Sequence, residues 1–282
     1  MRIGVFTKPE FLEAESGDTR YLVERLPDRF DVSVYFEEDV RLCAGDDVVF
    51  SRFGIPMRRP FLRRLATVDG PLMINDPTAR LRFGTKRNLL EFPDLTARTI
   101  VPGSADEVRA FAREEGRVVL KPLERHAGEG VIRLDPGRTE RPDWDRFYAD
   151  YVKTYGGAVA QAYLEEVVEV GDKRINVFGY EAVNAILTIP AEGSFLGHRL
   201  FGGTEVPATI EKRDEELLAR VIPFLREHGI WWAGLDVIGS KLSELNIVSP
   251  SMVWRADIVN GDTRGLEGII AKLETFGAAR VA

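Results

Sequence analysis

The sequence has 282 residues, of which 44% are hydrophobic and 29% are charged, and this composition excludes wholesale disorder. The formal net charge of −7 argues against a general binder of nucleic acids or acidic membranes, because such proteins take their affinity from a basic surface. A local basic pocket for a phosphate ligand is still compatible with this charge.

Cysteine and histidine are too few for several kinds of site. The one cysteine, Cys43, excludes an intramolecular disulfide and an all-cysteine metal site, and it fits a reducing compartment. The three histidines are too scattered for a zinc site. The sequence starts without the apolar stretch of a signal peptide, and no apolar run approaches the ~20 residues of a membrane span. We therefore expect a cytoplasmic protein with neither a membrane nor nucleic acid as its partner.

The first part of the sequence reads as an α/β unit. Three short β-branched or aromatic runs predict strands, and a helix between the first two makes the arrangement parallel. The strands are expected at 2–6, 31–36 and 47–51, and the helix at 18–27, ended by Pro27. The arginine-rich stretch 58–65 looks like an amphipathic helix with a solvated face.

A second unit is expected after a turn at 75–77 and a short helical stretch that leads to Lys86. Ser104 should cap a helix over 106–115, with Glu107 at the capping-box position, and Gly116 should end it. Strands at 117–122 and 131–134 then flank a glycine-containing loop. This loop is not a Walker A loop, because no helix follows its glycines.

The remaining pattern continues to alternate helices and strands. Helices are expected at 143–153 and 212–228, strands at 158–163 and 173–178, and a glycine-containing loop at 190–204. Two alternating strands joined by a Gly-Ser-Lys turn fill 233–247.

This hairpin carries the strongest chemical signal. If Ser240 is the centre of the turn, Asp236 and Glu244 lie directly opposite each other, and Asn246 shares a face with Glu244. Facing like charges are destabilising on their own. A hard divalent cation such as Mg²⁺ would remove the conflict, since it prefers oxygen ligands. The alternative is a strand face whose acids simply point into water.

Two lysines point to an anionic ligand. Lys121 ends a strand of apolar residues next to the glycine-containing loop, and Lys86 stands at the entry to the same unit. Either lysine alone is a common surface charge. Together with a two-acid metal cluster, they fit a nucleoside triphosphate whose phosphates the lysines neutralise.

The order of these motifs resembles the ATP-grasp ligases, and within them the bacterial glutathione synthetases. The closest stretch is Gly234-Leu235-Asp236-Val237-Ile238-Gly239 followed by Leu242-Ser243-Glu244-Leu245-Asn246-Ile247-Val248-Ser249-Pro250, which is similar to the family signature GLDVIG…LTEINVTSP. Other matches are Asn75-x-Pro77 with Lys86, Leu120-Lys121-Pro122-Leu123, Gln161-x-Tyr163-Leu164, Gly171-Asp172-Lys173-Arg174, Ile189-Pro190 and Gly202-Gly203.

The resemblance implies roles for these positions. Metal ligands would be Asp236, Glu244 and Asn246, and the ATP phosphates would meet Lys86 and Lys121. The adenine hinge would be Gln161, Tyr163 and Leu164, with Glu169 on the ribose. Arg174 would serve the reaction centre with Lys121. The substrates would contact Arg52, His198, Arg199, Gly202, Gly203 and Ser249.

Some positions depart from the family pattern. Thr188 stands where the family has an arginine before Ile-Pro, and Leu196-Gly197-His198 replaces Arg-Gly-Asn. The phosphate-covering loop Gly-Met-Gly-Gly is Arg125-His126-Ala127-Gly128, and Gly54 replaces an acidic residue. The metal and lysine positions are intact, so the departures bear on the substrate more than on ATP-dependent ligation.

The expected architecture is an α/β (α+β) ATP-grasp fold with a Rossmann-like N-terminal domain. We expect domains at 1–85, 86–160 (a lid) and 161–282 (with the metal site), and loops at 124–130 and 190–203 that close over the reactants. The resemblance implies ATP, Mg²⁺ or Mn²⁺, and amide formation through an acyl phosphate from a γ-glutamyl peptide and an amino acid. Left open are a same-mechanism ligase for other amino acids or peptides, an ATP-grasp kinase, a non-catalytic ATP-binding protein, and a homo-oligomer.

Overall fold

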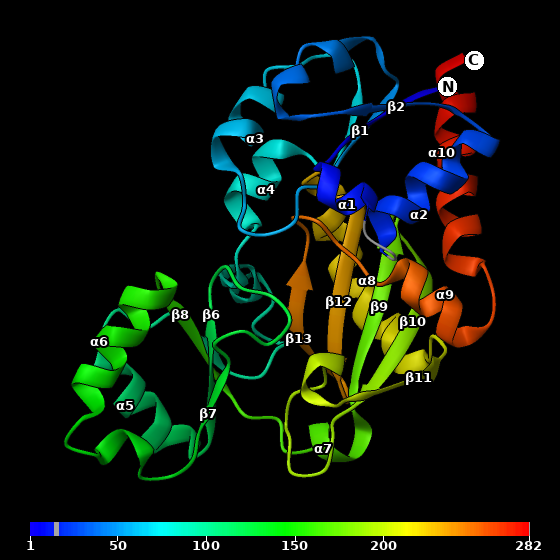
Figure 1. The fold of residues 1–282 in the computed structure, drawn as a ribbon. Helices are drawn as coiled ribbons and strands as arrows, with labels where there is room; N and C mark the ends of the chain where they lie inside the picture. Colours follow the sequence, from blue (N-terminus) through cyan, green and yellow to red (C-terminus); the bar gives the residue numbers. More distant parts are fainter. Residues whose placement is uncertain (14–16, 282) are drawn as a thin grey trace.

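The computed structural model describes residues 1–13 and 17–281, and these residues form three β-sheets (Figure 1). Two sheets belong to one body. The sheet β5-β8-β6-β7 projects from this body with its own pair of helices (Figure 1). Short 3-10 helices connect several elements, at Leu26–Asp28, Glu37–Asp39, Leu42–Gly45, Lys86–Glu91, Arg138–Glu140 and Arg199–Phe201.

The first sheet is parallel, with the order β2-β1-β3-β4. Its strands are β1 (Arg2–Phe6), β2 (Asp31–Tyr35), β3 (Val48–Ser51) and β4 (Leu72–Ile74). The helices of this part are α1 (Pro9–Glu13), α2 (Asp18–Arg25), α3 (Arg59–Leu65) and α4 (Pro77–Phe83). The structure thus contains the predicted strand–helix–strand unit, and the helix ends just before Pro27.

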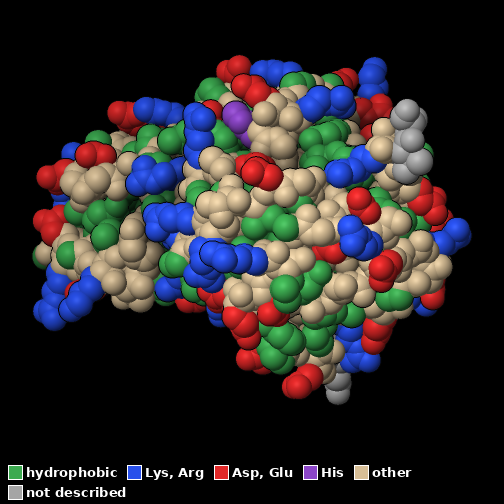
Figure 2. Space-filling view, turned by 90° about the horizontal axis from the view of Figure 1, so that it is seen from above, with side chains coloured by type: hydrophobic (Ala, Val, Ile, Leu, Met, Phe, Trp, Pro, Cys, Tyr) green, Lys and Arg blue, Asp and Glu red, His purple; other side chains and the backbone are tan. Residues whose placement is uncertain are grey.

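The predicted arginine-rich helix is α3, and three arginines of this stretch form ion pairs. Arg64 contacts Glu37 at 3.3 Å, Arg58 contacts the same carboxylate, and Arg59 contacts Glu124. Figure 2 shows this upper face, on which Lys and Arg side chains are mixed with Asp and Glu. The expected solvated face is present, although Arg59 also ties α3 to the loop that contains Glu124.

The second sheet is antiparallel, with the order β5-β8-β6-β7. It consists of β5 (Thr99–Ile100), β6 (Val118–Pro122), β7 (Ile132–Leu134) and β8 (Ala158–Ala162), and it packs on α5 (Ala105–Glu115) and α6 (Trp144–Tyr155). As predicted, the Ser104 hydroxyl accepts the amide of Glu107 at 3.2 Å, while the Glu107 carboxylate caps Gly103 at 3.0 Å. This sheet and its two helices form the projecting lobe.

The third sheet has the order β11-β10-β9-β12-β13. Its strands are β9 (Asp172–Phe178), β10 (Glu181–Ile189), β11 (Thr204–Ala208), β12 (Trp232–Ile238) and β13 (Lys241–Asn246). Near it lie α7 (Val167–Val170), α8 (Lys212–Glu227), α9 (Val253–Asn260) and α10 (Arg264–Val281). The sequence pattern did not predict β10, β11, α9 or α10.

One hydrophobic core joins the first and third sheets. It contains Ile3 and Val5 of β1, Trp232 of β12, and Ile269 and Leu273 of α10, all fully or almost fully buried. In Figure 1, α10 runs along this side of the body and brings the two ends of the described chain close together. The first sheet therefore rests on residues from the other end of the sequence.

The buried side-chain amide of Asn75 also connects the first and third sheets. The Asn75 side chain donates to the carbonyls of Trp232 at 2.6 Å and Ile247 at 2.8 Å, and its oxygen accepts the Trp232 amide at 2.6 Å.

The predicted division at 1–85, 86–160 and 161–282 stays a prediction. Within the described residues, no helix is both long and apolar enough to cross a membrane.

Candidate active site

The predicted hairpin is the centre of the candidate site. Its strands β12 and β13 are joined by the two residues Gly239 and Ser240, and Gly239 has φ +59, which favours glycine at this position. Asp236 and Glu244 are register partners, as predicted. A bulge after Asp236 pairs Val237 with Leu242, so the turn is tighter than one centred on Ser240. The two acids still meet across the ladder.

A cavity of about 790 Å³ opens beside this hairpin. It is lined by strands of the second and third sheets and by helix and loop residues of the N-terminal part, and its volume suits a nucleotide and a substrate. Most of the predicted site residues line it: Arg52, Lys86, Lys121, Gln161, Tyr163, Leu164, Arg174, His198, Arg199, Asp236, Glu244, Asn246 and Ser249. Glu169, Gly202 and Gly203 are not among its lining residues.

Asp236 is held by an arginine and an amide. Arg174, the register partner of Asp236 on the neighbouring strand β9, contacts both carboxylate oxygens, one of them at 3.0 Å. The Asn246 amide donates to Asp236 at 3.1 Å. Burial works against the positive charge of Arg174, but the Asp236 carboxylate outweighs it and raises the pKa of the guanidinium. The arginine is therefore a fixed positive charge at this point of the cavity.

Glu244 lies between two lysines. The Lys86 ammonium contacts it at 2.9 Å and also donates to the carbonyl of Arg125 at 2.6 Å. Lys121 donates to the Gln161 side chain at 2.7 Å and to the carbonyl of Ser243 at 3.0 Å. These two lysines link the hairpin to the second sheet and to the loop that contains Arg125.

The charges of this cluster shift its proton affinities. Burial lowers the pKa of Lys121. Burial alone would raise the pKa of Glu244, but Lys86 and Lys121 outweigh it and the pKa lies below its usual value. Glu244 is therefore held in its charged form beside two basic side chains, in a site that is largely withdrawn from water.

Asp172 is a further acid that the sequence reasoning missed. It lines the same cavity, and its Oδ1 atom is buried without a hydrogen-bond partner among the described residues. Burial raises the pKa of Asp172 well above its usual value, and the charge of Asp236 adds to this. The sequence could have indicated this acid. Asp172 and Arg174 are two residues apart on β9, so a strand that points Arg174 into the site also points Asp172 there.

The predicted hinge lies where the chain leaves the second sheet for the third. Gln161 is buried in β8 and donates to the Thr99 hydroxyl at 3.0 Å, while Tyr163 and Leu164 follow the strand. The Tyr163 ring lies 5.4 Å from the guanidinium of Arg133. Glu169 is exposed on α7, so the structure does not bring it to the cavity with the other predicted nucleotide residues.

The oxygen atoms of the hairpin fit a hard divalent cation. Among the described residues, no three His, Cys, Asp or Glu side chains form a metal-binding group. The available set is two directly opposed carboxylates and one amide, Asp236, Glu244 and Asn246. Magnesium commonly takes one or two carboxylates and completes its shell with water and phosphate oxygens. The donor set therefore matches a cation that arrives with a polyphosphate.

Comparison with known proteins decides the family. The model described as "Prokaryotic glutathione synthetase, ATP-grasp domain" matches residues 85–261. The chain belongs to this family. Its members of known name include the glutathione synthetase of Synechococcus elongatus, which is 36% identical over 209 residues, covering 72% of this chain and 62% of that protein. The chain thus spans less than two thirds of this relative's length.

A further relative agrees with this family, and a solved structure agrees with the fold. The glutathione synthetase of Parasynechococcus marenigrum is 35% identical over 216 residues, which are 74% of this chain and 69% of that protein. Among solved structures, D-cycloserine synthetase DcsG superposes with a TM-score of 0.70 at 17% identity, covering 97% of this chain and 100% of that one. The predicted α/β class and ATP-grasp fold are therefore confirmed.

The substrate end of the cavity is where this chain departs from the family pattern. Thr188, which replaces the family arginine, pairs across β10 and β11 with Glu205, and both residues line the cavity. The Glu205 side chain is held by Arg255 at 2.5 Å. The sequence pattern singled out Thr188 but not Glu205, because β11 was not predicted.

Three predicted substrate residues line this end of the cavity, and they differ in burial and in hydrogen-bond partners. Arg52 is buried, stacks on the Trp232 ring at 4.3 Å, and donates to the Thr19 hydroxyl at 3.3 Å and to the carbonyl of Pro250. Burial lowers the pKa of Arg52 to about 10. The His198 Nδ1 atom accepts the Leu200 amide at 3.2 Å, and burial lowers the pKa of the imidazole. Arg199 is exposed at the rim.

Proposed function

We propose that this family member is an ATP-dependent carboxylate–amine ligase, with glutathione synthesis from γ-glutamylcysteine and glycine as the nearest named activity. One observation carries the proposal. Three cations, Lys86, Lys121 and Arg174, converge on the opposed acids of the β12–β13 hairpin inside one large cavity. This arrangement suits the binding of a triphosphate and the transfer of its terminal phosphoryl group.

The nucleotide would lie between the second and third sheets. Lys86 and Lys121 would neutralise its phosphates, and the backbone at Gln161, Tyr163 and Leu164 would read adenine. Asp172 is a better ribose partner than Glu169, because it lines the cavity with a free oxygen whereas Glu169 is exposed outside it. A carboxylate oxygen can accept hydrogen bonds from both ribose hydroxyls.

Replacing Asp172 by Asn tests this assignment. The loss of one of the two acceptor oxygens should raise the Kd for ATP by about 10- to 100-fold. It should raise the Kd for 2′-deoxy-ATP less, because that nucleotide lacks one of the two hydroxyls. Calorimetric titration measures both constants, and Glu169→Gln is the matched control, expected to bind as the parent does. An unchanged Kd for ATP in Asp172→Asn, or a raised Kd in Glu169→Gln, would contradict this assignment and favour Glu169 as the ribose partner.

Asp236, Glu244 and Asn246 would hold Mg²⁺, with Mn²⁺ as the alternative. When bound, this ion shields the charge that gathers on the transferred phosphoryl oxygens. Arg174 would work beside it. Because Asp236 fixes its guanidinium in the cavity, the arginine can stabilise the developing negative charge without reorganising during the reaction.

The proposed reaction has two balanced steps. A carboxylate oxygen of the acid substrate attacks the terminal phosphorus of ATP, and ADP leaves with the electrons of the broken P–O bond. The amine then attacks the acyl carbon of the resulting acyl phosphate, inorganic phosphate leaves, and the ammonium proton is released. The acid and the amine would bind near Arg52, Arg199, Ser249 and His198, with the backbone at Gly202 and Gly203 closing over them.

Glu205 favours a second candidate, a ligase of the same mechanism for other amino acids or peptides. The cavity face that pairs Thr188 with Glu205 offers a carboxylate and a hydroxyl. A substrate carboxylate such as that of glycine finds no cation from these two residues. Arg52 and Arg199 would still offer cations to a glycine carboxylate, so Thr188 and Glu205 support the second candidate and leave the first in place.

The experiment is ADP release by the purified protein with ATP and Mg²⁺, with acids and amines added singly and together. ADP formation that requires γ-glutamylcysteine and glycine, with glutathione found by mass spectrometry, supports the named activity. Turnover with another acid–amine pair supports the second candidate. Phosphorylated product without amide would point to a kinase, and ATP binding without any turnover on a broad panel would contradict both ligase proposals.

The proposed location of the protein is the cytoplasm, where ATP is available.

Two loops touch over the cavity and would shield the acyl phosphate. The Phe201 ring packs on Gly128, where an added methyl group would lie 2.6 Å from the ring. Phe195 of the same loop lies against Tyr163, with ring centroids 6.1 Å apart. Glycine is needed at position 128 for this close approach and for its φ of +77.

Phe201→Ala should uncouple ATP use from ligation. Removing the ring weakens loop closure by about 1–2 kcal/mol, so water reaches the acyl phosphate more often. The molar ratio of ADP to amide product should rise from near one to about two or more. Leu200→Ala is the matched control, because this neighbour is 75% exposed. A ratio that stays at one in Phe201→Ala, or rises equally in both variants, would contradict the role of this contact.

A further inference from the structure

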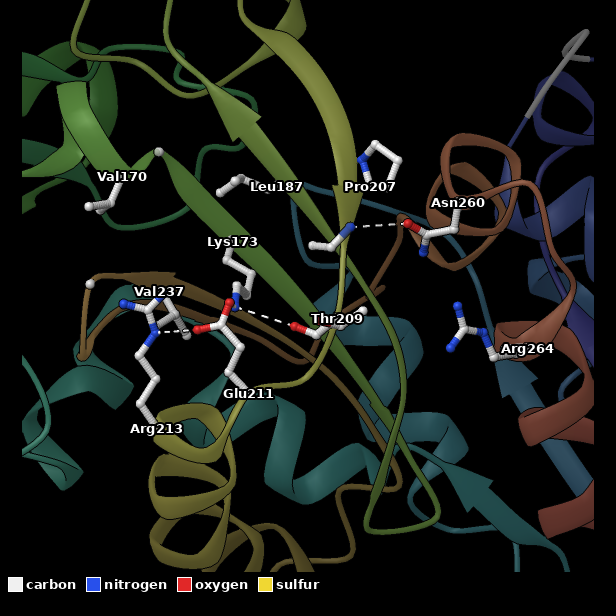
Figure 3. A pocket seen from close by; sticks show the side chains of 13 residues that line it. Val170, Lys173, Leu187, Pro207, Thr209, Glu211, Arg213, Val237, Asn260 and Arg264 are labelled. Atoms are coloured by element: carbon white, nitrogen blue, oxygen red, sulfur yellow. Dashed lines mark hydrogen bonds and ion pairs between the residues drawn. The ribbon is translucent and has the colours of Figure 1, made fainter.

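A second cavity of about 270 Å³ lies on the opposite face of the third sheet (Figure 3). Its volume is close to the lower end of ligand pockets, ~300–1,000 Å³, so it suits a small metabolite. Apolar walls come from neighbouring strands, and polar groups come from the starts of α8 and α10. The lining is Val170, Gly171, Lys173, Leu187, Pro207, Ala208, Thr209, Glu211, Arg213, Val237, Gly239, Asn260 and Arg264.

The floor of this cavity is a fixed polar network. Lys173 is almost fully buried and contacts Asp214 at 2.8 Å, Glu211 at 3.2 Å and the carbonyl of Thr209 at 3.4 Å. Asn260 accepts the amide of Ala208 at 3.1 Å (Figure 3). Lys173 is therefore already neutralised, and a ligand would have to meet other charged groups.

Two arginines at the rim are such groups. Arg213 is anchored by a contact of its Nε atom with Glu211 at 2.8 Å, and Arg264 by a contact of its Nε atom with Asp262 at 2.5 Å. Among the described residues, none accepts a hydrogen bond from their terminal Nη groups. Both arginines are also in the first turns of helices, α8 and α10, where the helix dipole favours an anion. Each guanidinium is thus oriented, partly exposed and able to take a carboxylate in bidentate fashion.

We propose that this cavity binds a small dicarboxylate that acts as an effector. Figure 3 shows Arg213 and Arg264 on opposite sides of the cavity; Leu187 and Pro207 lie along the wall between them, and Val237 lies beside Arg213. A ligand with one carboxylate at each end and a short apolar middle matches this order of charged and apolar groups. Inorganic phosphate offers neither a second carboxylate nor an apolar middle, so it should bind more weakly.

The effector role follows from the alternation of side chains along strands. Lys173 and Val237 face this cavity, while their neighbours Arg174 and Asp236 face the candidate active site. Both pairs are in register on the adjacent strands β9 and β12. On β10, Leu187 and Thr188 repeat the pattern. A ligand that repositions the back of these strands therefore shifts the acid and the arginine at the front.

Titration of glutarate into the protein tests the binding site. Glutarate should bind saturably and more tightly than butyrate or inorganic phosphate. Arg213→Ala and Arg264→Ala should each raise its Kd about tenfold, because each removes one charge-assisted pair. Arg220→Ala is the matched control on the same helix, since Arg220 does not line the cavity. The site is refuted if glutarate does not bind saturably, or if the Kd is unchanged in both rim variants.

A second titration tests the coupling. The Kd for ATP should change at least about twofold at saturating glutarate, and ATP should change the glutarate Kd by the same factor, because binding linkage is reciprocal. The change should disappear in Arg213→Ala and Arg264→Ala. Glutarate binding with an unchanged ATP Kd would refute the effector role. A protein that binds glutarate but no ATP would refute the proposed ligase and leave the glutarate titration valid for the cavity.

Discussion

Replacing Glu244 by Gln is expected to reduce ATP-dependent turnover by on the order of 10²- to 10³-fold while the protein still folds. The amide keeps the shape of the side chain but removes one of the two charges available to a divalent cation. It also leaves Lys86 and Lys121 without the acid between them. Asp236→Asn should have a similar effect on turnover, with an added cost from Arg174, which loses its partner.

A comparison with and without metal distinguishes a ligand from a merely structural acid. In the parent, Mg²⁺ should tighten ATP binding relative to EDTA, and Glu244→Gln should lose most of that gain. Glu181→Gln is the control, because this exposed acid belongs to the same sheet but not to the cavity. A Glu244→Gln protein that turns over at the parent rate, or keeps the full Mg²⁺ gain, would show that the metal assignment is wrong.

Asn75→Ala is expected to destabilise the protein by about 3–9 kcal/mol. The substitution leaves the Trp232 amide and the carbonyls of Trp232 and Ile247 buried without partners, and each such group costs about 1–3 kcal/mol. Folded proteins are stable by only about 5–15 kcal/mol, so this is a large fraction of the total. The effect should be on stability rather than on the chemistry of the cavity, because Asn75 does not line it.

Thermal and urea unfolding of the parent and the variant measure this cost. The Tm of Asn75→Ala should fall by roughly 10 °C or more. Thr78→Ala is the matched control, because Thr78 is exposed on the helix that starts two residues after Asn75. A fall of only a degree or two in Asn75→Ala, or an equal fall in the control, would contradict the role given to this amide.

The hairpin shows what the sequence could predict about the site. Asp236 and Glu244 are eight residues apart around a turn, so their opposition depends on local geometry alone. The bulge next to Asp236 could not be read from alternation, yet it leaves the acid pair in place. The helix start at Ser104 was likewise predicted correctly, because capping depends on a few adjacent residues.

The unpredicted features depend on partners far away in the sequence. Arg174 meets Asp236 because β9 pairs with β12, about 60 residues later, and no local pattern encodes that pairing. β11 was not predicted, because its residues gain strand structure only from pairing with β10. Glu169 was assigned from its position in the family pattern. Asp172 is buried in the cavity and Glu169 is exposed outside it, and this difference appears only in the folded chain.

The shared core of β1 and α10 has a consequence for how the protein is made. On the ribosome, Ile3 and Val5 emerge roughly 260 residues before Ile269 and Leu273, which cover them. Until then the first sheet exposes an apolar surface, and such long-range contacts also make folding slow. The nascent chain therefore has a long interval in which a holdase chaperone would protect it. A fragment of residues 1–85 should be prone to aggregate when synthesised alone.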